Sequence, residues 1–427
     1  MRNSNKIITG LIVLCCLSSI IVEAAENLDD LDVTLDFARQ IAANFVYFHT
    51  KSQLIGSDEW KDAALSEPVL YYDLNGNVKA YCFSVVKNDQ DFGYLILSSK
   101  KSSPPIMEFS LKPAPHKRTF PILKQAAQKY ILANKLDKKI GAPFFIYLCP
   151  SKYLVQFPLI DKTNPQSFNE SIYVDMRSAV IVRNVKTEVY TVQHRSKQTI
   201  VPWNILQNIN ALTEQTKIVF ALLKDVQAYP YLRSTHSIAV AGLLNYLGMK
   251  DKKLPLKAFI AGITTYIEKC LCDLPEKPII WKIGKGIKEF SVYQGYRIEI
   301  DEKCRYSANT EEEIQFADLK IKINKTYPVI VTFLYEPHYH HDLETARQRI
   351  TGSSVIGTGY LEYQIGQYLA GLDGLFKDEE LLIDKKNLAT ETRNTVTFYN
   401  WDGDYSNLII VSVLKLTKMN GIETKIE

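Results

Sequence analysis

Hydroxyl and imidazole side chains meet at the start of one apolar helix, in the stretch RSTHSIAVAGLLNYLG that ends at Gly248. Ser234, Thr235 and His236 stand at a helix end, where backbone amides lack partners. A hydroxyl there either caps the helix or, with a general base to take its proton, acts as a nucleophile. Adjacent helical residues point in different directions, so Thr235 and His236 form no dyad by adjacency. The stretch predicts an N-cap at Ser234 or Thr235. The alternative is a hydrolytic site that pairs one of these hydroxyls with His236 or another histidine.

A second polar cluster lies in the segment EPHYHHDLETARQR, with His338, His340, His341 and Asp342. Imidazole nitrogens and a carboxylate are ligands that Zn²⁺ and Cu²⁺ accept. In an extended segment His338 and His340 share a face, whereas His341 points away. The segment is predicted to be a solvated loop, and a metal site built on these four residues is the alternative.

The elements that must position these residues follow from periodicity. Helical spacing of apolar residues predicts helices over 31–49 and 120–136. Asn75-Gly76, between two runs rich in strand-forming residues, predicts a hairpin. From residue 201 onward, helical patterns come first and strand patterns follow. This order predicts an α+β fold with an antiparallel sheet.

Two parts of the chain resemble known peptidase families. The segment VKAYCFSVVKNDQDFGYLILSSKKSSPPIMEFS resembles the propeptide-like domain of streptopain-type cysteine peptidases. The elements STHSIAVAGLLNYLG, GKGIKEFSVYQGY, GSSVIGTGYLE and TVTFYNWDGD resemble, in order, those of papain-like, bacteriocin-processing (double-glycine) peptidases. The second resemblance spans about residues 201 to 414. Together they imply a papain-like fold preceded by a small domain of one helix and an antiparallel sheet.

The expected organisation has four parts. Residues 1–25 are predicted to be a signal segment, and 26–115 a propeptide-like α+β domain. Residues 116–200 are expected to form a β-rich middle region or linker. Residues 201–427 are expected to form the papain-like domain.

The resemblance assigns the catalytic positions to residues of unsuitable type. It places the nucleophile at Thr235, the base at Ser353 and the orienting residue at Asn400, and of these only Asn400 suits its role. Cysteine peptidases depend on a thiolate, and no helix terminus ionises a threonine hydroxyl near neutral pH. The oxyanion-stabilising glutamine corresponds to Gln207, with Asn204 an equal candidate.

The predicted function is therefore that of a pseudoenzyme that binds a peptide or protein without cutting it. An imidazole within reach of the Thr235 hydroxyl would overturn this prediction. One alternative is an active peptidase of the same fold with relocated catalytic residues. Another is a secreted metal-binding or adhesion protein that uses His338 to His341. No cofactor is expected.

Composition and the N-terminal segment bear on location and partners. The 427 residues carry a formal net charge of +4, which looks spread along the chain without a basic stripe, so nucleic acid is not expected as a partner. Arg2 and Lys6 precede the apolar run IITGLIVLCCLSSII, and the small residues Ala24 and Ala25 follow. This pattern predicts a signal peptide cut after Ala24 or Ala25 and a secreted protein without a membrane partner. An uncleaved membrane anchor is the alternative.

Five cysteines would remain after removal of the signal segment, an odd number for an oxidising compartment. Cys270 and Cys272 are too close in sequence to bond each other comfortably. One of these two, bonded to Cys304, is the expected disulfide.

Overall fold

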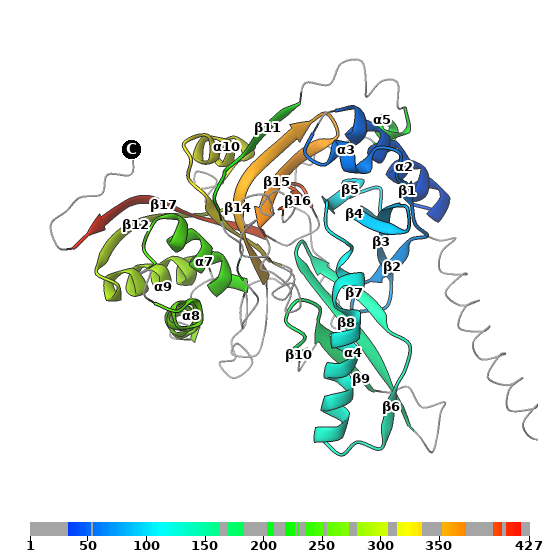
Figure 1. The fold of residues 1–427 in the computed structure, drawn as a ribbon, viewed down its shortest axis with the longest axis horizontal. Coiled ribbons are helices and arrows are strands. Elements are labelled where there is room, and N and C mark those ends of the chain that lie inside the picture. The colour runs from blue at the N-terminus through cyan, green and yellow to red at the C-terminus, as the bar shows by residue number, and fades with distance from the viewer. Residues whose placement is uncertain are drawn as a thin grey trace, which may run out of the picture.

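The chain adopts a mixed α+β fold in which helices pack on a large, mostly antiparallel sheet (Figure 1). The computed structural model describes residues 33–52, 54–161, 170–182, 203–208, 218–226, 229, 235–250, 254–272, 280–305, 314–334, 352–372, 396–403 and 407–419. The predicted signal segment 1–25 lies outside these residues. In the described part, no helix combines the length and apolar character needed to cross a bilayer.

The N-terminal unit is a helix followed by a meander of strands, as its sequence predicts. Helix α2 (Leu35–Lys51) starts at Thr34, whose hydroxyl accepts a hydrogen bond from the Phe37 amide at 3.3 Å. The short helix α3 (Ser57–Trp60) follows. The strands are β1 (Ala64–Leu65), β2 (Val69–Tyr72), β3 (Val78–Lys87), β4 (Gln90–Ser98) and β5 (Ile106–Ser110). The predicted hairpin at Asn75-Gly76 joins β2 to β3, and Gly76 adopts the left-handed conformation that this turn requires (φ +85°).

The middle region has a hydrophobic core in common with the N-terminal unit and is more than a linker. It contains α4 (Pro115–Ala133), β6 (Lys138–Ile140), β7 (Phe144–Cys149), β8 (Lys152–Asp161), β9 (Glu170–Asp175) and β10 (Ile181–Val182). Strand β7 pairs in parallel with β2, with Phe145 opposite Tyr71. Leu123 of α4 packs in one cluster with Tyr94 of β4 and Val155 of β8. The expected boundary at residue 115 therefore runs through this cluster.

The C-terminal part places helices on both faces of its strands. Its helices are α5 (Trp203–Gln207), α7 (Thr235–Tyr246), α8 (Leu256–Cys272), α9 (Ile280–Tyr293) and α10 (Phe316–Asn324). Its strands are β11 (Val219–Leu222), β12 (Tyr296–Cys304), β13 (Val329–Leu334), β14 (Gly352–Tyr363), β15 (Gly366–Leu372), β16 (Val396–Asn400) and β17 (Asn407–Lys418). They pair in the order β12–β17–β13–β14–β15–β16, and β11 extends along β14. Helices α7, α8 and α9 pack into one apolar cluster with this sheet, and α10 packs into another.

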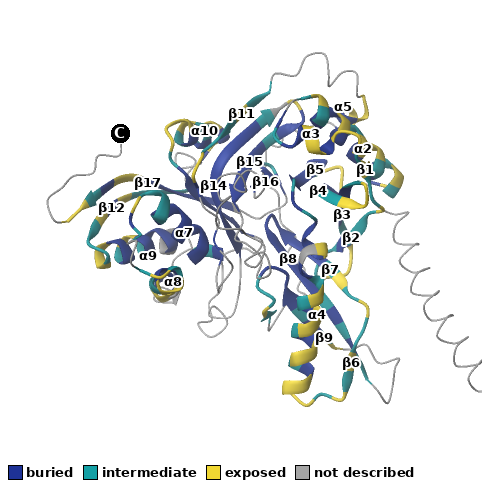
Figure 2. Cartoon of the chain, in the orientation of Figure 1, coloured by how far each residue is buried: buried dark blue, intermediate teal, exposed yellow. Residues whose placement is uncertain are grey.

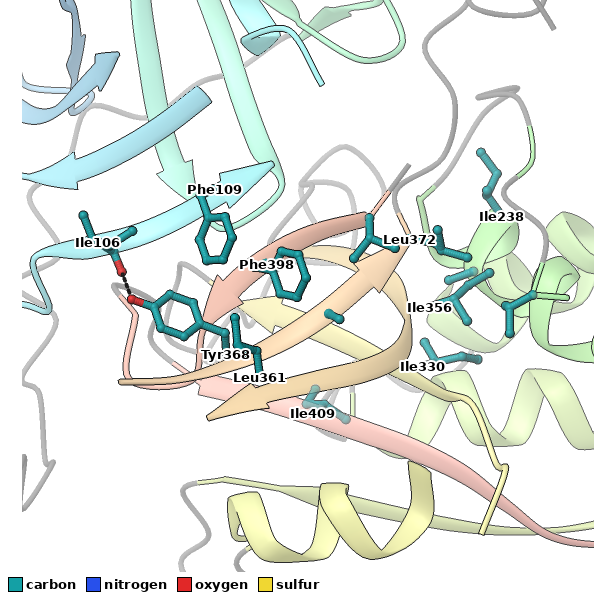
Figure 3. Packing of buried hydrophobic residues seen from close by; sticks show 14 of the residues in the cluster. Ile106, Phe109, Ile238, Ile330, Ile356, Leu361, Tyr368, Leu372, Phe398 and Ile409 are labelled. Atoms are coloured by element: carbon teal, nitrogen blue, oxygen red, sulfur yellow. Dashed lines mark hydrogen bonds between the residues drawn. The ribbon is translucent and has the colours of Figure 1, made fainter. Parts of the chain in front are cut away.

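A direct strand pairing joins the two halves of the molecule. Strand β5 of the N-terminal unit pairs with β16, and the ring of Phe109 stacks on that of Phe398 with centroids 4.7 Å apart. Figure 3 shows this contact within a row of buried residues that continues to Ile356 and, on α7, Ile238. In Figure 2, buried residues (dark blue) are found on both β5 and β16, the two strands that pair at this junction.

The cysteines do not form the expected bridge between Cys270 and Cys304. Cys82, Cys149, Cys270 and Cys304 are buried, and the structure forms no disulfide among these four. The side chain of Cys272 lies outside the described residues, as does the alternative pairing that uses it.

Candidate functional site

The head of α7 lies directly against strand β14. Thr235 is the first residue of the helix and is buried, and its hydroxyl oxygen accepts a hydrogen bond from the Ser354 amide at 3.1 Å. Ser234, the other candidate N-cap, lies outside the described residues. The Thr235 hydroxyl therefore joins the start of α7 to strand β14 of the sheet through this hydrogen bond.

The Ser354 hydroxyl is the centre of a small polar cluster. It lies 2.5 Å from Nδ1 of His236 and 2.7 Å from the hydroxyl of Thr332, its partner across the β13–β14 ladder. Thr332 and Ser354 are buried, and His236 is half-buried. We call Thr235, His236, Thr332 and Ser354 the α7–β14 cluster. Its imidazole is bonded to the hydroxyl of Ser354, which the sequence analysis did not single out.

Ser353, the residue at the predicted base position, points to the other side of the sheet. Successive residues of a strand face opposite sides, so a shift of one position changes the environment completely. The Ser353 hydroxyl accepts a hydrogen bond from the Ser151 hydroxyl at 2.7 Å and also lies 3.3 Å from the Ser151 carbonyl oxygen. The structure thus brings Ser354, and not Ser353, to the head of α7.

Two buried charges lie beside the cluster. Lys152, at the start of β8, forms an ion pair with Asp175 of β9, and both side chains are buried. Burial alone would raise the pKa of Asp175, but Lys152 and hydrogen bonds from Ser178 hold it below its usual range. Burial, assisted by the positive charge of Lys152, lowers the pKa of His236 to about 4. His236 is therefore neutral at pH 7.

The electrostatics disfavour proton abstraction by His236. A histidine that acts as a general base becomes an imidazolium ion, which catalytic triads stabilise with a carboxylate. Here the nearby charge is the ammonium group of Lys152, which destabilises that ion. The carboxylate beside Lys152, Asp175, already pairs with that lysine and accepts backbone hydrogen bonds from Arg177 and Ser178. The α7–β14 cluster can hold elements together but is poorly suited to activating a nucleophile.

Asn400, the predicted orienting residue, joins the two halves of the molecule. Its side-chain amide donates to the carbonyl oxygen of Ile106 at 3.1 Å, and its own oxygen accepts from the Asp402 amide at 2.9 Å. Tyr368 donates to the same Ile106 carbonyl at 3.2 Å (Figure 3). Asn400 thus contacts β5 of the N-terminal unit through these bonds.

The oxyanion candidates lie far from α7. Gln207 and Asn204 are exposed on α5, which packs against α2 through the rings of Trp203 and Phe37, 5.7 Å apart. In addition, Asn44 of α2 donates to a backbone carbonyl of α5 at 2.6 Å. Figure 1 shows α5 and α7 on separate sides of the molecule. The structure therefore does not bring Gln207 or Asn204 to Thr235.

The predicted metal-binding residues, His338, His340, His341 and Asp342, lie outside the described residues. Within the part of the chain that is described, no three His, Cys, Asp or Glu side chains gather in a way that could hold a metal ion.

Ser354, Thr332 and Lys152 were not among the residues predicted from sequence. Strand alternation within the pair Ser353-Ser354 was the one available signal, because a one-residue change in register exchanges the two hydroxyls. Nothing in the sequence around Lys152 indicates a contact with α7, which depends on how the β7–β8 turn docks.

A scan against protein-family models gives no match for this chain. A search of curated proteins also finds nothing similar.

Proposed function

We propose that this protein is secreted, has a papain-like layout without catalytic activity, and binds a peptide or protein. The main support is the 3.1 Å hydrogen bond between the Thr235 hydroxyl and the Ser354 amide. In a papain-like peptidase, a substrate carbonyl must enter between the head of the central helix and the strand that carries the base. Here these two elements are in direct contact, and both residues are buried.

The types of residue give a second support. A threonine hydroxyl needs a base during attack, and the base position offers only the hydroxyls of Ser353 and Ser354. His236 is held neutral by burial and by Lys152, so its basicity is far below that of an ordinary histidine.

A binding role is supported by the way the C-terminal sheet accommodates a turn of the chain itself. The β7–β8 turn places Ser151 against Ser353, and Cys149 packs among apolar residues of the sheet that include Val331 and Phe333. The Ser353 side chain of β14 and the Phe333 carbonyl of β13 thus already hold a turn-shaped segment. Because the β7–β8 turn covers this surface, we infer that a peptide or protein partner of similar shape would bind here by displacing the turn.

The proposal is tested with purified protein and a peptide library. We expect no cleavage product, no labelling by a thiol-directed probe or a serine-directed fluorophosphonate, and retention of a subset of peptides. Turnover that disappears in Thr235→Ala would refute the claim of inactivity. A library that is neither cut nor retained would refute the binding role.

An active hydrolase with relocated residues is the second candidate, and the 2.5 Å contact between His236 and Ser354 favours it. This candidate predicts fluorophosphonate labelling that is lost in Ser354→Ala and kept in Ser353→Ala. The two serines are neighbours and equally buried, so Ser353→Ala controls for damage to the strand. We expect neither the natural protein nor either variant to be labelled.

A further inference from the structure

The positive charge of the protein is concentrated in one region, contrary to the even distribution expected from sequence. Residues 115–182, from α4 to β10, contain ten Lys and Arg but four Asp and Glu, a net charge of +6. The whole chain has +4, so the remainder is slightly acidic. We call this region the arm. Figure 1 shows it extending away from the rest of the molecule.

Helix α4 carries much of this charge on its solvent side. Its sequence, PHKRTFPILKQAAQKYILA, has four Lys and Arg and no acidic residue. Lys117 and Lys124 are exposed and seven residues apart, which places them on one line along the helix. Lys129 is also exposed but lies about 140° around the helix from Lys124, at the other edge of the exposed face. The exposed Lys135 follows the helix end. Along the helix axis, Lys117 and Lys129 lie about 18 Å apart at helical rise.

Most of these cations have no carboxylate partner nearby. Lys117 pairs with Asp91 at 2.7 Å. Lys124, Lys129 and Lys135 form no ion pair with the described residues. Like charges held this close raise the local potential and attract a polyanion.

We propose that the exposed face of α4 binds a linear anionic polysaccharide. Gln125 and Gln128 are exposed among the lysines, and their amides can donate to and accept from sugar hydroxyls. The ammonium groups supply charge-assisted hydrogen bonds to carboxylate or sulfate groups. Cations spread over about 18 Å of one helix, with Lys135 just beyond its end, match a chain that carries charges at intervals along its length.

The other residues of the face favour this partner over two alternatives. Single-stranded nucleic acid is bound through exposed aromatic rings, and the described aromatic side chains of α4 are half-buried. A membrane surface needs a broad apolar area, but Leu132, with 77% exposure, is the exposed large hydrophobic residue of α4. The face is therefore cationic and amide-rich, which suits a hydrated, charged sugar chain.

The test measures binding of the full chain to heparin and to polygalacturonate by calorimetry at low salt. We expect binding that weakens as salt rises. We expect the triple variant Lys124→Glu, Lys129→Glu, Lys135→Glu to lose about tenfold or more in affinity. The neutral triple variant with Gln at the same positions should give an intermediate loss. Circular dichroism verifies that α4 remains folded.

A matched variant distinguishes binding at the exposed face of α4 from a general effect of the protein's net charge. Lys257→Glu, Lys325→Glu and Lys415→Glu together change the charge equally at exposed sites outside the arm. This variant should keep its affinity within about twofold, since long-range charge is screened. An equal loss in both triple variants would overturn the proposal. So would no binding to either polysaccharide, or tighter arm-dependent binding to duplex DNA or to vesicles containing phosphatidylserine.

Discussion

The half-buried carboxyl group of Glu302 makes the stability of the protein depend on pH. It lies on β12 with its side chain against α9, where the Gly284 amide donates to it at 3.4 Å. A Cβ atom at Gly284 would lie 2.4 Å from the carboxylate, so a side chain there would displace the Glu302 carboxylate from this position. Burial raises the pKa of Glu302 to about 8, despite the opposing effects of the Gly284 amide and Lys288. At neutral pH the folded protein therefore holds this proton.

Replacement of Glu302 by glutamine should remove a pH dependence of stability. In the folded state the pKa of Glu302 is raised from its ordinary value of 4.5 to about 8. The stability linked to this proton is fully present below pH 4.5 and is lost as pH rises through 8. The natural protein should lose up to about 1.4 kcal/mol per pH unit within this window. Urea midpoints measured between pH 5 and pH 8.5 should decline for the natural protein and much less for Glu302→Gln.

The neighbouring Asp301 provides the control for this measurement. It pairs loosely with Lys322, at 3.5 Å, from the opposite side of the strand. Asp301→Asn is the same change from carboxyl to amide and should keep the decline of the natural protein. Parallel declines in the natural protein and in Glu302→Gln would contradict the role given to Glu302.

At the scale of elements, the periodicity of apolar residues predicted where the helices lie. The register of the strands could not be predicted in the same way. The predicted helices over 31–49 and 120–136 correspond to α2 and α4, because a 3.6-residue repeat of apolar side chains is a local property. Which serine of β14 faces α7 depends on a register that distant strands impose, and here it selected Ser354 over Ser353. Sequence alone could not fix that choice, nor the docking of Lys152 beside His236.

The end of α4 combines a strained conformation with a cation of the arm. The Leu136 amide donates to the Ile131 carbonyl at 3.0 Å, and the Lys135 amide donates to the Leu132 carbonyl at 3.1 Å. This is a Schellman termination, in which the left-handed position is usually glycine. Lys135 occupies it with φ +52°. A side chain there costs stability relative to glycine.

Lys135→Gly should therefore stabilise the helix end and weaken polysaccharide binding at once. We expect a gain of about 0.5 to 1 kcal/mol, seen as slower hydrogen exchange in the last turn of α4. Lys135→Ala removes the same cation without relieving the strain, so it should weaken binding to a similar degree with no gain in protection. Equal affinity in the natural protein and both variants would count against Lys135 as part of the binding surface.

At the scale of the whole molecule, the residues at the positions predicted for catalysis form hydrogen bonds that join separate parts of the structure. Ser353 bonds to Ser151 of the middle region, Asn400 bonds to Ile106 of β5, and Thr235 joins α7 to β14. The mixed α+β class was predictable from the order of helical and strand patterns. The sharing of one core between the halves was not, because the β5–β16 pairing connects residues almost 300 positions apart.

This pairing predicts that the N-terminal unit stays bound after the chain is cut. A protease site introduced between residues 183 and 202 would separate the sequence into two pieces. We expect the pieces to elute together in size-exclusion chromatography, because β5 pairs with β16 and Phe109 stacks on Phe398. A propeptide that is discarded on maturation would instead leave as a separate peak.

The stacked pair of rings offers the discriminating variant. Removal of a buried phenylalanine ring typically costs about 3 to 5 kcal/mol, so Phe398→Ala should weaken the association of the cut pieces enough to release some N-terminal piece. Tyr293→Ala removes a ring that is 69% exposed on α9 and should leave the association intact. Release of the N-terminal piece from the otherwise natural chain would show that the junction is transient, and that residues 26–182 act on the C-terminal sheet as a removable partner.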